Sequence, residues 1–294
     1  MSGQSDTASV LIAEARRRFA EAELGDPATD ARVLVAGVLG LSLSDVLTRG
    51  DVEVSREQAE EVRAAITRRC KHEPVHRILG RRWFYGLDLQ LSPATLEPRP
   101  DTEILVDCVL PHLKRKIAEK GTARLLDLGV GTGAISLALL KECPQARAVG
   151  SDISEEALST AERNAYINGV AERFETVHSA WFSHINGRFD IIVSNPPYIP
   201  TGVVAELDPE VRNYDPLTAL DGGEDGLDAY RALSTGAGDY LLANGLVAVE
   251  IGYDQKKSVT TLFENAGFSL FEARRDYGGN DRVLLFTTQN CCAC

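Results

Sequence analysis

The sequence predicts an α/β fold of the Rossmann-like type, in which a seven-stranded, mainly parallel sheet follows a small N-terminal helical domain and a β-hairpin. A strand-like run, a glycine turn and a helical run follow one another from Ala123 to Lys141, as at the start of nucleotide-binding α/β folds. Strand-like and helix-like segments then alternate to about Ala266, and residues 268–275 and 282–287 predict a closing antiparallel pair. Before residue 76, apolar residues recur with helical spacing instead.

Length and composition are those of an ordinary globular protein. The chain has 294 residues, of which 44% are hydrophobic and 25% charged, enough for one large domain and one small one. No apolar run approaches the roughly 20 residues that a membrane span needs, and the first residues lack the pattern of a signal peptide. The net charge of −12 disfavours a protein that wraps nucleic acid. We therefore expect a cytoplasmic protein without membrane association or direct nucleic-acid binding.

The six cysteines fit a reducing compartment better than a disulfide framework. Cys70, Cys108 and Cys143 lie singly in helix-like segments, and we expect them to be small buried hydrophobic residues. The other three crowd the last four residues without partners for a metal site. We expect residues 290–294 to form an exposed, disordered tail, and we predict no metal site.

Three segments are expected before that tail. Residues 1–76 read as several short helices, one of them opened by a capping box at Ser55 to Gln58, and we expect this domain to dock a partner. Residues 77–96 predict a β-hairpin linker, because aromatic residues, a central glycine and period-two alternation occur there. Residues 97–289 are expected to form the main domain.

The main domain opens with a proline-rich stretch, Glu97 to Glu103, which keeps the chain extended until Asp101 or Thr102 caps a helix that runs to about Lys120. This stretch is either a rigid linker or a part of the pocket wall. In the second case Arg99 and Glu103 reach the pocket.

The glycine turn, Asp127-Leu128-Gly129-Val130-Gly131-Thr132-Gly133, indicates the ligand. A dinucleotide fingerprint is G-x-G-x-x-G, whereas the order here is G-x-G-x-G with an aspartate two residues before the first glycine. An acidic residue beside the turn suits the amino and sulfonium groups of S-adenosylmethionine. The next strand, 146–153, carries Asp152 near its end, where a carboxylate accepts both ribose hydroxyls. Trp181 follows a third strand, where its ring either packs on adenine or belongs to the core.

A second motif, Asn195-Pro196-Pro197-Tyr198, follows the strand-like run 189–193. Two consecutive prolines fix the backbone and donate no hydrogen bonds, so they form a stiff turn at the carboxyl end of a strand. Ligands of open α/β sheets bind at that end. The motif therefore predicts a site that grips a planar NH₂ group. The long segment 199–220 after it suggests a lid.

The chain resembles the protein-(glutamine-N5) methyltransferases that modify peptide chain release factors, the HemK/PrmC family, from its helical region to about Phe286. The residues that carry the resemblance are Pro74-Val75, Ile78-Leu79-Gly80, Phe84-Tyr85-Gly86, Pro98 to Glu103, Leu126 to Gly133, Ser194 to Ile199, Gly222 to Leu227, Glu250-Ile251-Gly252 with Gln255, and Asp276-Tyr277-Gly278 with Arg282. Departures from the usual family pattern are Glu97, Asp101, Val130 and Asp215. The resemblance implies the fold of a class I S-adenosylmethionine-dependent methyltransferase.

The resemblance also implies roles for the two motifs. The Asn195 side-chain oxygen and the Pro196 carbonyl would accept the two N–H bonds of a glutamine in the Gly-Gly-Gln loop of a class I release factor. Tyr198 would pack on the amide, and Pro197 completes the substrate-binding set. The implied cofactor-binding residues are Asp127, Leu128, Gly129, Val130 and Gly131 for the methionine end, Asp152 for the ribose, Trp181 for the adenine, and Asn195. S-adenosylhomocysteine would be the product.

Two other functions remain open from the residues alone. An adenine-N6 methyltransferase of DNA or RNA needs the same acceptors and ring to hold a flipped base, although the acidic charge balance disfavours it. An S-adenosylmethionine-binding regulatory protein without catalysis is disfavoured by the complete second motif. The glycine spacing disfavours a NAD oxidoreductase.

Overall fold

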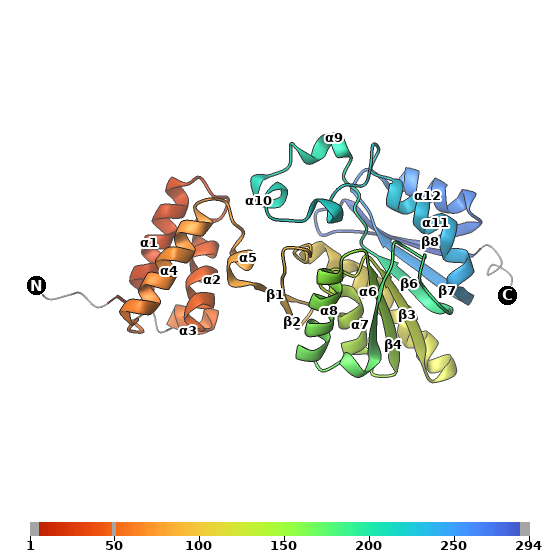
Figure 1. The fold of residues 1–294 in the computed structure, drawn as a ribbon, viewed down its shortest axis with the longest axis horizontal. Coiled ribbons are helices and arrows are strands. Elements are labelled where there is room, and N and C mark those ends of the chain that lie inside the picture. The colour runs from red at the N-terminus through yellow and green to blue at the C-terminus, as the bar shows by residue number, and fades with distance from the viewer. Residues whose placement is uncertain (1–5, 49–50, 289–294) are drawn as a thin grey trace, which may run out of the picture. The chain divides into compact units, whose positions relative to one another are not determined.

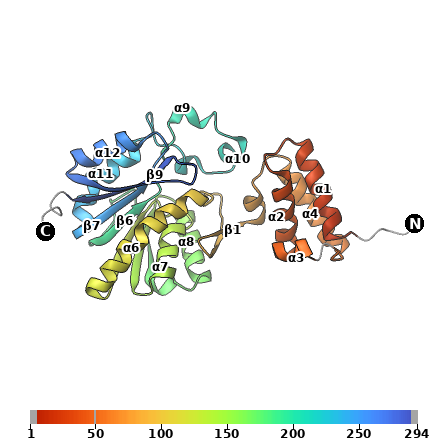
Figure 2. The same ribbon diagram turned by 180° about the vertical axis from the view of Figure 1, so that it is seen from behind.

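The computed structural model describes residues 6–48 and 51–288. The chain divides into two compact units (Figures 1 and 2). The helical unit contains the residues up to Arg81 and also the segment Asp208–Tyr214, and the sheet unit contains Arg82–Leu207 and the chain from Asp215 onward. The predicted tail, 290–294, lies outside the described residues. The boundaries expected at residues 76 and 96 stay predictions.

The part of the helical unit before Arg81 contains α1 (Ala8–Glu21), α2 (Pro27–Leu39), α3 (Leu43–Thr48), α4 (Arg56–Arg69) and α5 (Val75–Leu79). The predicted capping box is confirmed, since the Ser55 hydroxyl accepts from the Gln58 N–H while the Gln58 side chain accepts from the Ser55 N–H. Leu11, Phe19 and residues of α2 and α4 form a shared apolar core. Val10 of α1 lies outside this core and is 46% exposed.

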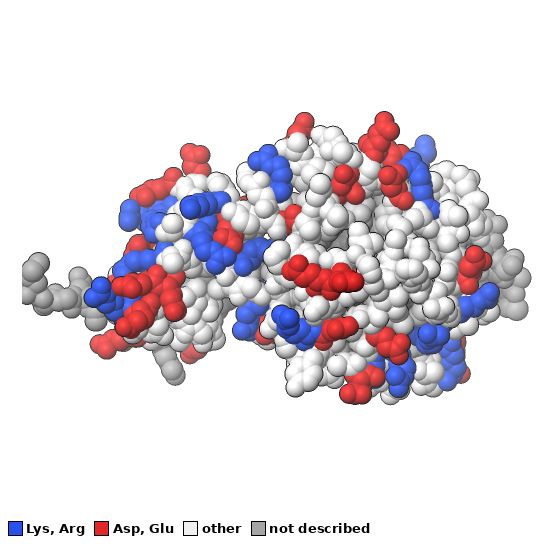
Figure 3. All heavy atoms as spheres, viewed as in Figure 1, with Lys and Arg blue, Asp and Glu red and all other residues white. Residues whose placement is uncertain are grey.

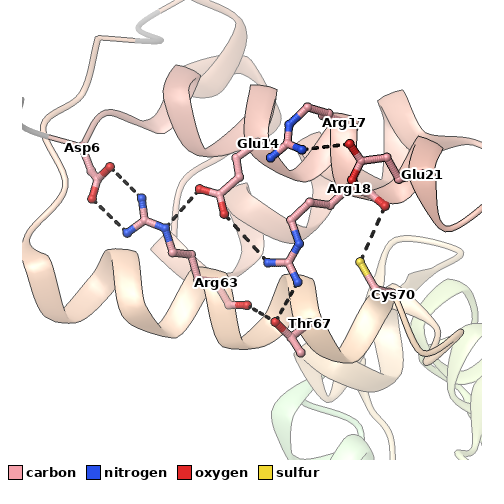
Figure 4. A network of polar contacts seen from close by, with 8 residues as sticks. All are labelled: Asp6, Glu14, Arg17, Arg18, Glu21, Arg63, Thr67 and Cys70. Carbon is pink, nitrogen blue, oxygen red and sulfur yellow. Dashed lines mark hydrogen bonds and ion pairs between the residues drawn. The ribbon is translucent and has the colours of Figure 1, made fainter.

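A polar network joins α1 to α4 (Figure 4). The Arg63 guanidinium donates to both carboxylate oxygens of Asp6, at 2.8 and 3.1 Å, and to Glu14 at 3.1 Å. Arg18 donates to the Thr67 hydroxyl at 3.0 Å. Positive and negative side chains lie intermixed on the face of this unit that Figure 3 shows.

The segment Asp208–Tyr214 belongs to the helical unit although it lies in the long loop that follows the second motif. It contains α10 (Pro209–Arg212), and Glu210 pairs at 2.6 Å with Arg69, whose side chain is only 4% exposed. Arg69 also pairs with Asp30 at 2.8 Å. A buried guanidinium needs such partners, because an unpaired buried charge is costly. The segment predicted as a lid is therefore tied at its middle to the helical unit.

The sheet unit contains a seven-stranded sheet of order β5-β4-β3-β6-β7-β9-β8, parallel except for β9, and this confirms the predicted fold class. The strands are β3 (Ala123–Leu128), β4 (Ala146–Asp152), β5 (Phe174–His178), β6 (Phe189–Ser194), β7 (Leu241–Glu250), β8 (Phe268–Arg275) and β9 (Asp281–Thr288). The chain order reverses between β3 and β6, the switch point at which ligands of such sheets bind.

Helices cover both faces of the sheet (Figure 1). They are α6 (Glu103–Lys120), α7 (Ala134–Glu142), α8 (Glu155–Ile167), α11 (Asp228–Tyr240) and α12 (Lys256–Asn265). Alternate residues along the strands face the two layers: Leu125 and Val193 pack with α6, α7 and α8, whereas Leu126 and Ile192 pack with α11 and α12. The short α9 (Thr201–Val204) and a 3₁₀ turn, Leu217–Ala219, lie in the loop before α11. None of the described helices is long and apolar enough to cross a membrane.

The predicted β-hairpin is confirmed as β1 (Arg81–Phe84) and β2 (Leu87–Gln90). Asn164 of α8 and Asn168, the residue that follows α8, hold it, since the Gln90 N–H donates to Asn164 at 2.8 Å and the Asp88 N–H to Asn168 at 3.2 Å. The helix α11 ends at Tyr240, because Leu241 pairs with Phe189 of β6 and begins β7, where it is buried.

Candidate active site

One pocket lies at the carboxyl ends of β3, β4 and β6 and joins the two motifs. Seven of the residues predicted for the site line it: Gly129, Val130, Gly131, Asp152, Trp181, Asn195 and Pro197. The outermost of them, Gly129 and Pro197, are 68 residues apart in the sequence. Parallel strands bring their carboxyl ends to one edge, which is why these distant residues meet.

The glycine turn forms the floor of the pocket. Gly129 and Gly131 have φ values of 74° and 52°, in the left-handed region that favours glycine. A Cβ atom at either position would meet nothing within 4 Å, so both backbones border open space. The N–H groups of Gly129 and Val130 both donate to the Ser151 carbonyl at 2.9 Å, which ties the turn to β4.

Asp152, at the end of β4, stands beside this turn. Its Oδ2 accepts from the Gly131 N–H at 3.0 Å and its Oδ1 from the Ser154 N–H at 3.0 Å. Each carboxylate oxygen has a second lone pair for a ligand hydroxyl. The same contacts place Ser154 at the start of α8, where its hydroxyl accepts from the Ala157 N–H and caps the helix.

Asp127 and Leu128 do not line the pocket but lie beneath the turn, with exposures of 1% and 0%. Asp127 Oδ2 accepts from the Ser136 N–H at 3.2 Å, and its Oδ1 has no partner among residues 6–48 and 51–288. Burial raises the pKa of Asp127 to about 7, with a smaller contribution from the negative charge of Asp152, against the lowering effect of Ser136. Their predicted contact with a cofactor stays a prediction.

The Asn-Pro-Pro-Tyr turn leaves β6, whose six residues are all buried. Asn195 reaches into the pocket, and its Nδ2 donates to Thr102 Oγ1 at 3.2 Å. Pro196 and Tyr198 belong to the same turn but are not among the pocket-lining residues. The Gln255 side chain holds the turn by donating to the Tyr198 carbonyl at 2.9 Å. Burial, followed by the negative charge of Glu250, raises the pKa of Tyr198 to about 12.

Pro98 and Thr102 line the pocket, so the proline-rich stretch is part of its wall, and the structure adds residues that no motif indicated: Leu96, Ile135, Ile153 and Thr218. Arg99, which the proline-rich stretch placed as a candidate, lines the pocket and pairs with the buried Asp215 at 2.7 Å. Glu103 does not line it; its carboxylate accepts from the Tyr85 N–H at 2.8 Å. Glu97, an unusual residue at its position, is 4% exposed and pairs with Arg82.

Comparison with known proteins gives a consistent result. The family model of the PrmC N-terminal domain matches residues 11–80, and that of the methyltransferase small domain matches residues 102–206. A release factor glutamine methyltransferase of Agrobacterium fabrum is 58% identical over 97% of this chain and 99% of its own length. A release factor glutamine methyltransferase of Rhodospirillum rubrum is 45% identical over 91% of this chain and 81% of its own length. A methyltransferase from Pyrococcus furiosus, known from a crystal structure, is 21% identical in sequence, and the match covers 68% of this chain and 88% of that chain. The TM-score is 0.51, which shows a similar fold.

The fold and the pocket define a class I S-adenosylmethionine-dependent methyltransferase. The pocket fits that cofactor on three counts: an open glycine floor, a carboxylate with unused acceptor capacity, and apolar walls that include Ile135 and Trp181. The chain belongs to the release factor glutamine methyltransferase family.

Proposed function

We propose that this enzyme transfers a methyl group from S-adenosylmethionine to the side-chain amide nitrogen of the glutamine in the Gly-Gly-Gln loop of a class I peptide chain release factor. The observation that supports this most directly is that Asn195 lines the same pocket as the glycine turn and Asp152. An acceptor for a substrate N–H therefore stands beside the residues suited to the methyl donor.

On the cofactor side, Gly129, Val130 and Gly131 would hold the methionine end, with Asp127 beneath the turn. Asp152 would accept the ribose hydroxyls, and Trp181 would pack on the adenine. When bound, the cofactor supplies an electrophilic methyl group on a sulfonium.

On the substrate side, a primary amide nitrogen is a poor nucleophile because its lone pair is delocalised into the carbonyl. The Asn195 Oδ1 and the Pro196 carbonyl would accept its two N–H bonds and point the nitrogen at the methyl group. These oxygens stabilise the positive charge that grows on the nitrogen as it attacks. The Tyr198 ring would pack on the flat amide, with Pro197 beside it. The nitrogen would lose its extra proton to solvent after methyl transfer, so attack requires no strong base.

The proposed substrate suggests where the enzyme works. Release factors act in translation, so the enzyme would work in the cytoplasm, and the helical unit would be the docking domain for the release factor. The acidic balance of −12 favours a protein substrate over DNA or RNA, and the absence of direct nucleic-acid binding stays a prediction.

The test is label transfer. The full chain is incubated with methyl-labelled S-adenosylmethionine and, separately, a class I release factor, the same factor with its loop Gln changed to Asn, and duplex DNA. Label should appear on the wild-type factor only, and peptide mapping should place it on the loop glutamine. Label on DNA, or equal label on both release factors, would overturn the proposal.

A further inference from the structure

Glu250 carries a buried carboxyl group that the packing of the sheet does not require. It ends β7 after a run of buried apolar residues, and it is 2% exposed. Its Oε2 has no hydrogen-bond partner in the part of the chain that the structure describes. Burying a carboxyl without full pairing costs free energy, so a role beyond packing is expected.

The sheet register places Glu250 beside the substrate motif. Ser194 of β6 pairs with Val249 of the parallel neighbour β7, and Asn195 and Glu250 each follow one residue later. The two side chains therefore leave the same edge of adjacent strands. Thr102, in the 3₁₀ turn before α6, completes the group, because Asn195 Nδ2 donates to Thr102 Oγ1 at 3.2 Å.

Several groups face Glu250. The neighbouring hydroxyls of Thr102 and Tyr198 and the positive charge of Arg282 favour its charged form, whereas burial and the negative charge of Asp101 oppose it. The Tyr230 hydroxyl of α11 donates to the Glu250 backbone carbonyl at 2.9 Å. Arg282 is shared, since it also pairs with Asp276 at 2.9 Å and Asp101 at 3.5 Å. Burial is the largest effect, and the pKa of Glu250 is raised to about 7.

The donor and acceptor inventory then fixes the direction of the contacts. A threonine hydroxyl has one proton, and because Thr102 Oγ1 accepts from Asn195, that proton is available to the neighbouring carboxylate. With Nδ2 directed at Thr102, Asn195 presents Oδ1, an acceptor, to the substrate N–H. In the opposite orientation of the amide, Asn195 would present its Nδ2 donor to the substrate N–H, which is also a donor.

We propose that Glu250 is a positioning residue that, through the Thr102 hydroxyl, holds the Asn195 amide with its oxygen toward the substrate, and that also holds Tyr198 through its hydroxyl. The inference rests on the proposed function only in taking the substrate group to be an N–H donor. Protonation of Glu250 supplies Thr102 with a donor, frees the threonine proton to turn toward Asn195, and so removes the preference for the productive amide orientation.

The kinetic test uses Thr102→Val, its matched control Thr102→Ser, and Glu250→Gln in the full chain at saturating S-adenosylmethionine. Thr102→Val should lower kcat 10- to 100-fold, since small misplacements cost about that much, while Thr102→Ser recovers most of it. The wild-type kcat should rise between pH 6 and 8, and Glu250→Gln should be slower at pH 8 and lack that rise. Melting temperatures identify any variant that fails to fold. Wild-type kcat and pH profile in both Thr102→Val and Glu250→Gln would overturn the inference.

A second readout does not depend on the substrate. In protein labelled with ¹⁵N-asparagine, the Asn195 side-chain NH₂ signal, identified by its loss in Asn195→Ala, should titrate with a midpoint near pH 7 and stop titrating in Glu250→Gln. A titrating signal in an enzyme that does not methylate release factors would retain this inference and reject the proposed function. A signal unaffected by pH and by Glu250→Gln would reject this inference alone.

Discussion

The Gly131 N–H donates a hydrogen bond of 3.0 Å to Oδ2 of Asp152, and this contact joins the glycine turn after β3 to the carboxylate that ends β4. Asp152 therefore has two tasks: it orders the floor of the pocket, and it offers lone pairs to a ligand. The contact also places the glycine turn and Asp152 side by side in the wall of one pocket.

Asp152→Ala should weaken the binding of S-adenosylmethionine at least tenfold, about 1.4 kcal/mol, because it removes the acceptor for the ribose and frees the turn. Isothermal titration calorimetry measures the Kd directly. Asp239→Ala, at an exposed position of α11 outside the pocket, is the matched control and should bind as the wild type does. A Kd for Asp152→Ala within twofold of the wild type would contradict the role of Asp152.

Asn195→Ala should lower methyl transfer to a release factor by more than 100-fold while leaving most of the affinity for S-adenosylmethionine. The reason is that the variant loses the acceptor that orients the substrate nitrogen, whereas the glycine turn and Asp152 remain. Single-turnover transfer and calorimetry separate the two effects. Full activity in this variant would contradict the proposed role of Asn195 in orienting the substrate nitrogen.

Gly222→Ala should impair transfer by displacing the second motif. A Cβ atom there would lie 2.9 Å from the Pro197 carbonyl oxygen and 2.9 Å from the Tyr198 Cα, both backbone atoms that cannot rotate away. Overpacking of this kind costs about 1–3 kcal/mol, so we expect a lower melting temperature and a reduced kcat. Gly202→Ala, whose Cβ would meet nothing within 4 Å, is the control. Equal kcat values for the two variants would show that the turn tolerates the shift.

Asp127→Asn should change how stability depends on pH. The pKa of Asp127 in the folded chain, about 7, exceeds the ordinary value of 3.8. At a pH between these two values, Asp127 keeps its proton in the folded chain and loses it in the unfolded chain. The contribution of this group to stability is complete below about pH 4 and is lost as the pH rises to about 7.

Relative to Asp127→Asn, the free energy of unfolding of the wild type should therefore fall by about 2–3 kcal/mol between pH 5 and pH 8. Denaturant unfolding of both proteins at each pH measures the difference. Asp239→Asn, at an exposed position, should show no such change relative to the wild type. A constant difference between wild type and Asp127→Asn across this range would contradict the raised pKa.

Much of this architecture is determined by local sequence signals. Gly129 and Gly131 sit where the backbone needs a left-handed conformation, Ser55 and Ser154 cap helices, and the apolar runs of β3 to β6 suit strands buried on both faces. Such signals lie within a few residues of the structure they determine. They were sufficient to predict the seven-stranded sheet, the hairpin and both motifs of the pocket.

Contacts between residues that are distant in the chain depend on the tertiary structure. Local pattern did not reveal that Thr102 stands against Asn195, that Glu250 ends β7 beside them, or that Glu210 pairs with the buried Arg69 of the helical unit. It did not show either that Asp127 lies beneath the glycine turn instead of lining the pocket. Strand order and burial set these contacts, because they determine which side chains share an edge and which lose contact with water.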